Sequence, residues 1–65
     1  MAVIVVAFKH IYKKNGKIAE VSPDGIIHYL NSNRRMDWRN QVDAINHLIS
    51  DGWTWMKATE VNEKE

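Results

Sequence analysis

The chain has 65 residues, no cysteine, and nine Lys and Arg against eight Asp and Glu, which leaves a net charge of +1. A chain of this length forms one domain, and the lack of cysteine excludes disulfides, thiolate metal sites and cysteine nucleophiles. The near balance of charge excludes a general attraction to DNA or to membranes, so anion binding would need a local cluster. We expect a cytoplasmic protein.

A first strand of roughly eight to ten residues is predicted within residues 2–12, a run rich in β-branched and aromatic side chains. This run is too short to span a bilayer. Its two faces are about equally apolar, which is typical of a strand that is buried on both sides. Because one helix covers only one face of a sheet, we expect a second copy of the chain on the other face, and therefore a homo-oligomer with a dimer as its simplest form.

Two turn signals divide the next part of the chain into strands. Asn15-Gly16 is the dipeptide that best fits a two-residue type I′ hairpin turn, and it predicts a second strand over residues 17–21. Residues 22–25 (SPDG) carry proline at the second position and glycine at the fourth, which is typical of another turn. A third strand is therefore predicted over residues 26–30, followed by a polar loop over residues 31–33.

An amphipathic helix is predicted from about Trp38 to Asp51, with Asp37 as its N-cap and Gly52 as the left-handed residue that ends it. At 100° per residue, one face of this helix is apolar and is expected to contact the sheet. That face consists of Trp38, Val42, Ile45 and Ile49, with Leu48 beside them.

The last strand is predicted over residues 53–59, and the charged residues 60–65 are expected to form a frayed tail. Trp53 and Trp55 share one face of that strand. Two interpretations of this pair stay open. Either the indoles form the core beneath the helix, or one face of the strand lies on the sheet side without a helix and forms an interface.

The predicted architecture is a single α+β domain over residues 1–59, with the element order strand-strand-strand-helix-strand. A strand-helix-strand unit in one sheet crosses over right-handedly and has parallel strands. Placing the last strand beside the first gives a four-stranded mixed sheet of order 4-1-2-3. This arrangement puts the most apolar strand inside the sheet and the helix on one face.

The helix-to-strand junction over residues 45–56 (INHLISDGWTWM) resembles that of the small DUF4177-type domains. In those domains an amphipathic helix ends at a glycine-tryptophan pair that opens an apolar strand. The turn at residues 22–25 and the third strand depart from the pattern of that family and look like an additional hairpin arm. The family has no established activity, so the resemblance supports the fold and implies no mechanism.

Residues suited to catalysis or metal binding are not grouped in the sequence. His10, His28 and His47 fall on three different predicted elements, whereas a metal site usually needs three protein ligands held together. The serines lie in a turn, in a loop and near a helix end, without a recognisable activating base. A glycine-rich phosphate loop is also missing. We therefore expect no enzyme activity, no metal and no cofactor.

Residues 34–39 (RRMDWR) place three arginines and an indole at the start of the predicted helix. Cations are mildly unfavourable there, because the helix dipole is positive at its N-terminus. First-turn amides, guanidinium groups and a stacking indole together suit a phosphate-bearing ligand, either a nucleotide or a nucleic acid. The predicted binding residues are Arg34, Arg35, Trp38 and Arg39, with Lys13, Lys14 and Lys17 from the first hairpin.

Two other interpretations of this cluster stay open. Charged side chains at loops keep sheet edges soluble, and Arg39 is spaced to pair with Asp43, so the cluster also fits a solvated surface without a ligand. It fits the charged rim of a protein interface as well. In that case the chain would be a protein-protein regulator, such as a small accessory protein or a virus-encoded inhibitor, that docks on a larger protein target.

Overall fold

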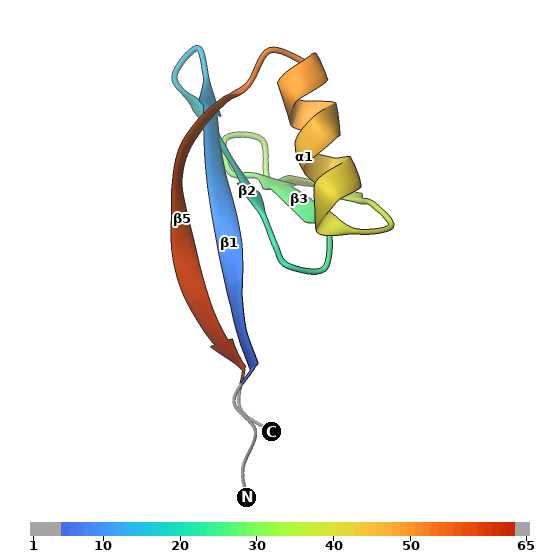
Figure 1. The fold of residues 1–65 in the computed structure, drawn as a ribbon. Coiled ribbons are helices and arrows are strands. Elements are labelled where there is room, and N and C mark those ends of the chain that lie inside the picture. The colour runs from blue at the N-terminus through green and yellow to red at the C-terminus, as the bar shows by residue number, and fades with distance from the viewer. Residues whose placement is uncertain (1–4, 64–65) are drawn as a thin grey trace, which may run out of the picture.

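The computed structural model describes residues 5–63, which form one helix packed on one face of a five-stranded sheet (Figure 1). All neighbouring strands are antiparallel, and their order in the sheet is β4-β3-β2-β1-β5. The α+β class is therefore confirmed, whereas the expected four-stranded mixed sheet is wrong. The elements are β1 (Val5–Lys14), β2 (Lys17–Val21), β3 (Ile26–Tyr29), β4 (Arg34–Asp37), α1 (Gln41–Ser50) and β5 (Thr54–Glu63).

The additional strand, β4, explains the error in topology. It pairs with β3 from Ile26↔Asp37 to Tyr29↔Arg34, in a segment that we expected to start the helix. Because direction alternates from β1 to β4, one extra strand reverses the direction in which the chain enters α1. β5 does lie beside β1 as predicted, but it runs antiparallel to β1 instead of parallel. The predicted start of the first strand, residues 2–4, lies outside the described residues.

Both turns form where the sequence predicts them. Asn15 and Gly16 have φ values of 50° and 79° and join β1 to β2 at the pair Lys14↔Lys17, as a type I′ hairpin requires. In the second turn, the amide of Gly25 donates to the carbonyl oxygen of Ser22 at 3.0 Å, and Gly25 has φ +92°.

The helix begins later than predicted and ends where predicted. Its N-cap is Asn40, whose Oδ1 accepts from the amide of Asp43 at 2.9 Å, while Asp37 ends β4 instead. At the other end, Gly52 has φ +89°, and its amide donates to the carbonyl of Ile49. The amide of Trp53 donates to the carbonyl of Leu48, which completes a Schellman motif. Within residues 5–63, no helix is long and apolar enough to cross a membrane.

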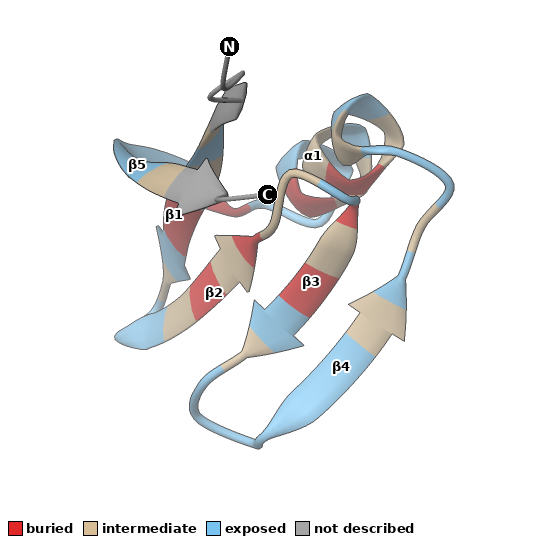
Figure 2. Cartoon of the chain, turned by 90° about the horizontal axis from the view of Figure 1, so that it is seen from below, coloured by how far each residue is buried: buried red, intermediate tan, exposed pale blue. Residues whose placement is uncertain are grey.

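The helix buries a different face from the predicted one. Ala44 and Leu48 are fully buried, whereas Val42 and Ile49 are 65% and 57% exposed. Ala44 is small, so α1 lies close over β2 and β3, and Val42 and Ile49 lie on its flank. Figure 2 shows the buried segments of these strands beneath the helix. The core consists of Tyr12, Ala19, Val21, Ile27, Ala44, Leu48 and Trp53.

The sheet ends in a two-stranded ribbon that projects from the rest of the molecule (Figure 1). Residues 5–9 of β1 pair with residues 59–63 of β5, whereas the pairing of β1 with β2 starts only at His10. The radius of gyration is accordingly 12.5 Å, against about 11 Å for a compact domain of this length. The expected frayed tail therefore does not begin at Glu60, because β5 continues to Glu63.

Candidate functional site

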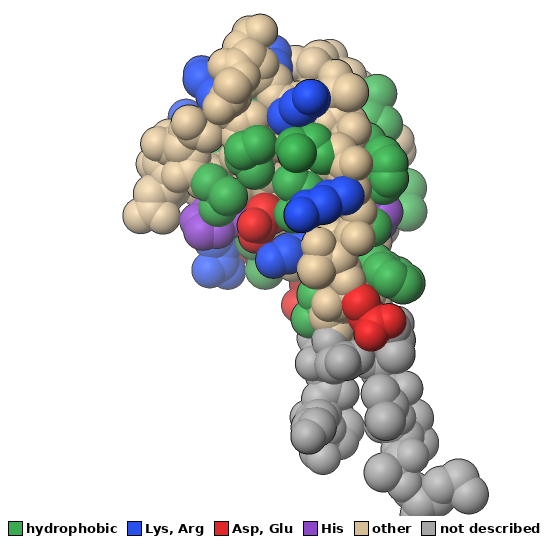
Figure 3. All heavy atoms as spheres, turned by 90° about the vertical axis from the view of Figure 1, so that its left-hand side faces the viewer, with side chains coloured by type: hydrophobic (Ala, Val, Ile, Leu, Met, Phe, Trp, Pro, Cys, Tyr) green, Lys and Arg blue, Asp and Glu red, His purple; other side chains and the backbone are tan. Residues whose placement is uncertain are grey.

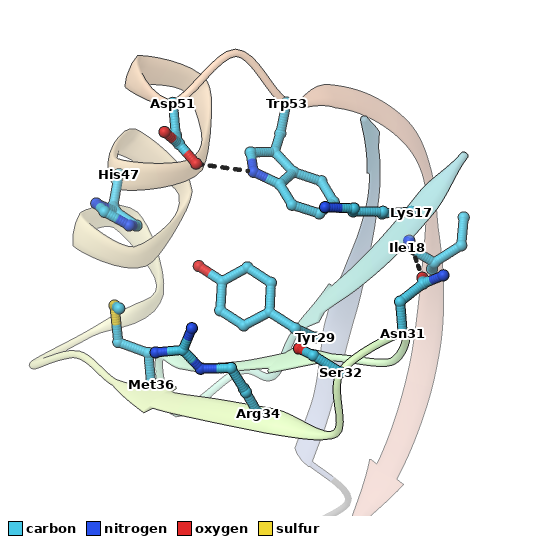
Figure 4. Close-up of a pocket in the computed structure, with 10 residues that line it drawn as sticks. All are labelled: Lys17, Ile18, Tyr29, Asn31, Ser32, Arg34, Met36, His47, Asp51 and Trp53. Carbon is cyan, nitrogen blue, oxygen red and sulfur yellow. Dashed lines mark hydrogen bonds between the residues drawn. The ribbon is translucent and has the colours of Figure 1, made fainter. Parts of the chain in front are cut away.

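A hollow of ≈ 460 Å³ opens between the C-terminal half of α1 and the adjoining edge of the sheet (Figure 4). Side chains reach it from β2, β3, β4, the loop between β3 and β4, α1 and the segment after α1. We call it the α1–β4 hollow. It is lined by Lys17, Ile18, Tyr29, Asn31, Ser32, Arg34, Met36, His47, Asp51 and Trp53.

Two cationic side chains line this hollow, Arg34 from β4 and Lys17 from the start of β2. Arg34 lies on the helix side of the sheet because it is paired with Tyr29, which packs against the core beneath α1. Among the described residues, neither cation lies within ion-pair distance of a carboxylate. Both charges are therefore available to an incoming anion.

Two aromatic rings form the apolar part of the hollow. The centroids of Tyr29 and Trp53 are 5.7 Å apart, with the rings tilted by 56°. Burial raises the pKa of Tyr29, the carboxylate of Asp51 raises it further, and the guanidinium of Arg34 opposes this. The Tyr29 hydroxyl is therefore protonated at neutral pH and is able to donate a hydrogen bond into the hollow.

The carboxylate of Asp51 is the acidic group in the hollow's lining, and it already has partners. Its Oδ2 accepts from Trp53 Nε1 at 3.2 Å (Figure 4) and lies 3.7 Å from Lys14 Nζ. Lys14 Nζ also donates to the backbone carbonyl of Asp51. These contacts offset the negative charge and leave Lys17 and Arg34 as the dominant charges facing a ligand.

The predicted basic cluster is divided between the two faces of the sheet. Because side chains alternate along a strand, Arg35 points away from the hollow, and its Nε lies 3.1 Å from Asp37 Oδ1. Arg35 therefore lies on the face of the sheet opposite α1, which we call the helix-free face. Lys13 lies on the same face, opposite Ile18 of β2. Of the seven predicted binding residues, the hollow therefore brings together Arg34 and Lys17, with Lys14 behind them.

The remaining two predicted residues, Trp38 and Arg39, lie between β4 and α1. Arg39 is exposed and reaches Asp43 Oδ2 at 3.3 Å. Trp38 packs on the core, its ring centroid lies 4.9 Å from that of His47, and its Nε1 is buried without a partner among residues 5–63. The premise that the arginines stand at a helix N-terminus is wrong for Arg34 and Arg35, which lie on β4, whereas Arg39 directly precedes the N-cap of α1.

Several lining residues, including Tyr29, His47 and Trp53, were not predicted as binding residues. The missing signal was the alternation through β4, which puts Arg34 and Met36 on the same face as Tyr29 once β4 is recognised as a strand. Asn31 and Ser32 carry no comparable signal, because a loop has no periodicity.

The helix-free face carries a second hollow, lined by charged groups that are largely paired. Lys9 Nζ lies 3.3 Å from Glu20 Oε1, and His28 Nε2 lies 3.3 Å from Asn33 Oδ1. The part of the chain that the structure describes contains no group of three His, Asp or Glu side chains that could hold a metal ion. This face is therefore less suited to a charged ligand than the α1–β4 hollow.

Comparison with protein-family models, with curated proteins and with solved structures gives no match for this chain. The resemblance of residues 45–56 to the DUF4177-type junction stays a prediction.

Proposed function

We propose that this chain is a small non-enzymatic, cytoplasmic binding protein whose α1–β4 hollow takes a phosphate-bearing ligand. The observation that carries the proposal is the placement of Lys17 and Arg34, which line one hollow and form no ion pair among residues 5–63. A guanidinium fork and an ammonium group suit the oxygens of a phosphate, because the first binds two oxygens at once and the second adds a mobile point charge.

The size and the aromatic lining of the hollow favour a single nucleotide unit over a duplex. A volume of ≈ 460 Å³ falls within the range of sites for small ligands. The rings of Tyr29 and Trp53 offer an apolar contact for a base. The Nδ2 group of Asn31 and the hydroxyl of Ser32 offer hydrogen bonds to its edges, while Asn31 Oδ1 already accepts from the amide of Ile18 at 2.9 Å (Figure 4). A free nucleotide or the end of a single strand meets these conditions.

Titration with inorganic phosphate, nucleoside monophosphates and triphosphates, and short single-stranded oligonucleotides at two salt concentrations tests the proposal. Tryptophan fluorescence is a suitable readout, because Trp53 lines the hollow. The double variant Lys17→Ala with Arg34→Ala is expected to weaken binding by about tenfold or more. The matched control, Lys13→Ala with Arg35→Ala, removes the same charge from the opposite face and is expected to change affinity much less.

Three results would contradict the proposal: no binding to any probe at millimolar concentration, equal losses in the two double variants, or binding that does not respond to salt. The last follows because phosphate contacts weaken as salt rises.

A second candidate function is a protein-protein regulator that docks on a larger target. The observation that favours it is the number of large apolar side chains at the surface, which include Phe8, Val42, Ile49, Trp55 and Met56. Recovery of one stoichiometric protein partner, free of nucleic acid and retained by the Lys17→Ala, Arg34→Ala variant, would favour this function over ligand binding.

A further inference from the structure

The helix covers only part of its face of the sheet. Its main contacts are with β2 and β3, and Tyr12 of β1 is buried in the same core, whereas the parts of β1 and β5 that carry Phe8 and Trp55 are exposed on that side. Trp55 is paired with the core residue Tyr12, and its Nε1 donates to His10 Nδ1 at 3.2 Å, which places the indole on the helix side. Phe8 follows on the same side of β1 by alternation, and Ala58 is paired with His10. Trp55 and Phe8 are 53% and 48% exposed, and Ala58 is exposed as well.

One flank of α1 faces this open strip. Gln41, the first residue of the helix, donates from Nε2 to the carbonyl oxygen of Phe8 at 2.7 Å, which fixes the flank that is turned toward β1. Ile45 is one turn further along that flank and is half-buried. Val42 and Ile49 lie beside it and are mostly exposed. The helix therefore adds a second apolar stripe next to the first.

We refer to these two stripes together as the helix–ribbon surface, which consists of Phe8, Trp55 and Ala58 on the sheet and Val42, Ile45 and Ile49 on the helix. We propose that it is the interface of a homodimer, in which α1 of each protomer packs against the β1–β5 strip of its partner. A two-fold axis allows this arrangement, because one protomer supplies both a projecting helix stripe and a flat strand strip.

The amount of exposed surface supports a second copy as the occupant. The chain exposes 4894 Å², more than the ~4,300 Å² of a compact monomer of this mass, and the projecting β1–β5 ribbon, which carries Phe8, contributes to the difference (Figure 1). One side of a standard protein interface buries about 800 Å². A net charge of +1 also means that two copies do not repel each other strongly.

The helix-free face, on which the sequence placed the interface, is a weaker candidate. Its centre carries the Lys9–Glu20 ion pair with His28 and Arg35 nearby, and burying such charges costs free energy.

Figure 3 shows the side of the molecule with β5, where hydrophobic side chains reach the surface between lysines and arginines. The dimer is independent of the α1–β4 hollow, which lies on the other flank of α1.

Sedimentation velocity or light scattering over a range from low micromolar to submillimolar concentration tests the proposal. The expected mass rises from the 7.6 kDa of one chain to twice that value. Phe8→Lys and Ile49→Lys are each expected to weaken association by at least about tenfold. Leu30→Lys is the matched control, because Leu30 is 43% exposed and lies in the loop between β3 and β4. Unfolding curves establish that each variant is folded.

A monomer mass over the whole range would overturn the proposal, as would equal losses in all three variants or no loss in Phe8→Lys and Ile49→Lys.

Isotope-filtered NOE spectra of a mixed labelled and unlabelled sample locate the interface directly. We expect contacts between the methyl groups of Val42 and Ile49 and the rings of Phe8 and Trp55 across protomers. Contacts along the outer edge of β5 or across the Lys9–Glu20 face would overturn the proposed surface. The Lys17→Ala, Arg34→Ala variant is expected to remain a dimer, so this proposal and the ligand proposal fail separately.

Discussion

Gly25 lies so close to the backbone of Asn40 that no side chain fits between them. A Cβ atom at Gly25 would lie 2.6 Å from the carbonyl carbon and oxygen of Asn40. The carbonyl oxygen of Gly25 also accepts from the amide of Trp38 at 2.9 Å. The turn between β2 and β3 is therefore packed directly against the N-cap residue of α1.

Gly25→Ala is expected to destabilise the fold by about 2–4 kcal/mol, because it adds backbone strain at φ +92° and forces Asn40 to move. Gly16→Ala is the matched control. Gly16 has φ +79° with nothing within 4 Å of the added Cβ, so we expect a loss of about 1–2 kcal/mol from the backbone alone. Urea unfolding measures both, and equal losses would contradict the close approach.

Asn40→Ala is expected to cost about 1 kcal/mol, because Asn40 Oδ1 accepts from a first-turn amide of α1. Asp37→Ala is expected to cost less than about 0.5 kcal/mol, since the one side-chain contact of Asp37 recorded within residues 5–63 is an exposed pair with Arg35. The same unfolding measurement compares the two. The opposite order would mean that Asp37 is the N-cap of the helix, as the sequence suggested.

Asp51→Asn is expected to raise the affinity of the hollow for an anionic probe by about threefold, because it removes a negative charge from the lining. The amide oxygen of the new side chain still accepts from Trp53 Nε1. Asp43→Asn is the control, because Asp43 pairs with Arg39 outside the hollow. Affinity is measured with the tightest-binding probe of the panel, and a decrease in Asp51→Asn would argue against an anionic ligand.

Stability is expected to fall in alkaline solution as Tyr29 ionises. Burial raises the pKa of Tyr29 above the 10.0 of an exposed tyrosine, so the unfolded chain loses this proton first. The part of the unfolding free energy that depends on protonated Tyr29 is intact below pH 10.0. It is lost as the pH rises through the pKa of Tyr29 in the folded state. Urea midpoints measured across this range for the parent and for Tyr29→Phe check this, and the variant is expected to lose less stability. Tyr12 shifts in the same direction through burial, so some alkaline loss remains in the variant.

The parts of the fold that local chemistry encodes were predictable from the sequence. Asn15-Gly16 and Gly52 adopt the positive φ values that their turns require, and both form at the predicted positions. β4 was not predictable in the same way, because Arg-Arg-Met-Asp has little strand propensity. It becomes a strand through pairing with β3, and it thereby fixes the direction of β5 and the start of α1.

The candidate site was predictable only in part for a related reason. Arg34 and Lys17 belong to the predicted basic set, but their grouping depends on two strands that meet through β3. Adjacent arginines look like one cluster in a sequence, whereas β4 sends Arg34 and Arg35 to opposite faces. Membership of a hollow built from several separate segments is a property of the tertiary structure.

The projecting ribbon makes the outer half of β1 and β5 sensitive to its surroundings. A pair of strands without a third is only marginally stable in water, so its backbone amides are expected to open in local unfolding events that leave the core folded. Residues 5–9 and 59–63 should therefore exchange hydrogen for deuterium fastest among the strands when the protein is dilute. If a partner covers Phe8 and Trp55, the same amides become slower to exchange as the protein concentration rises.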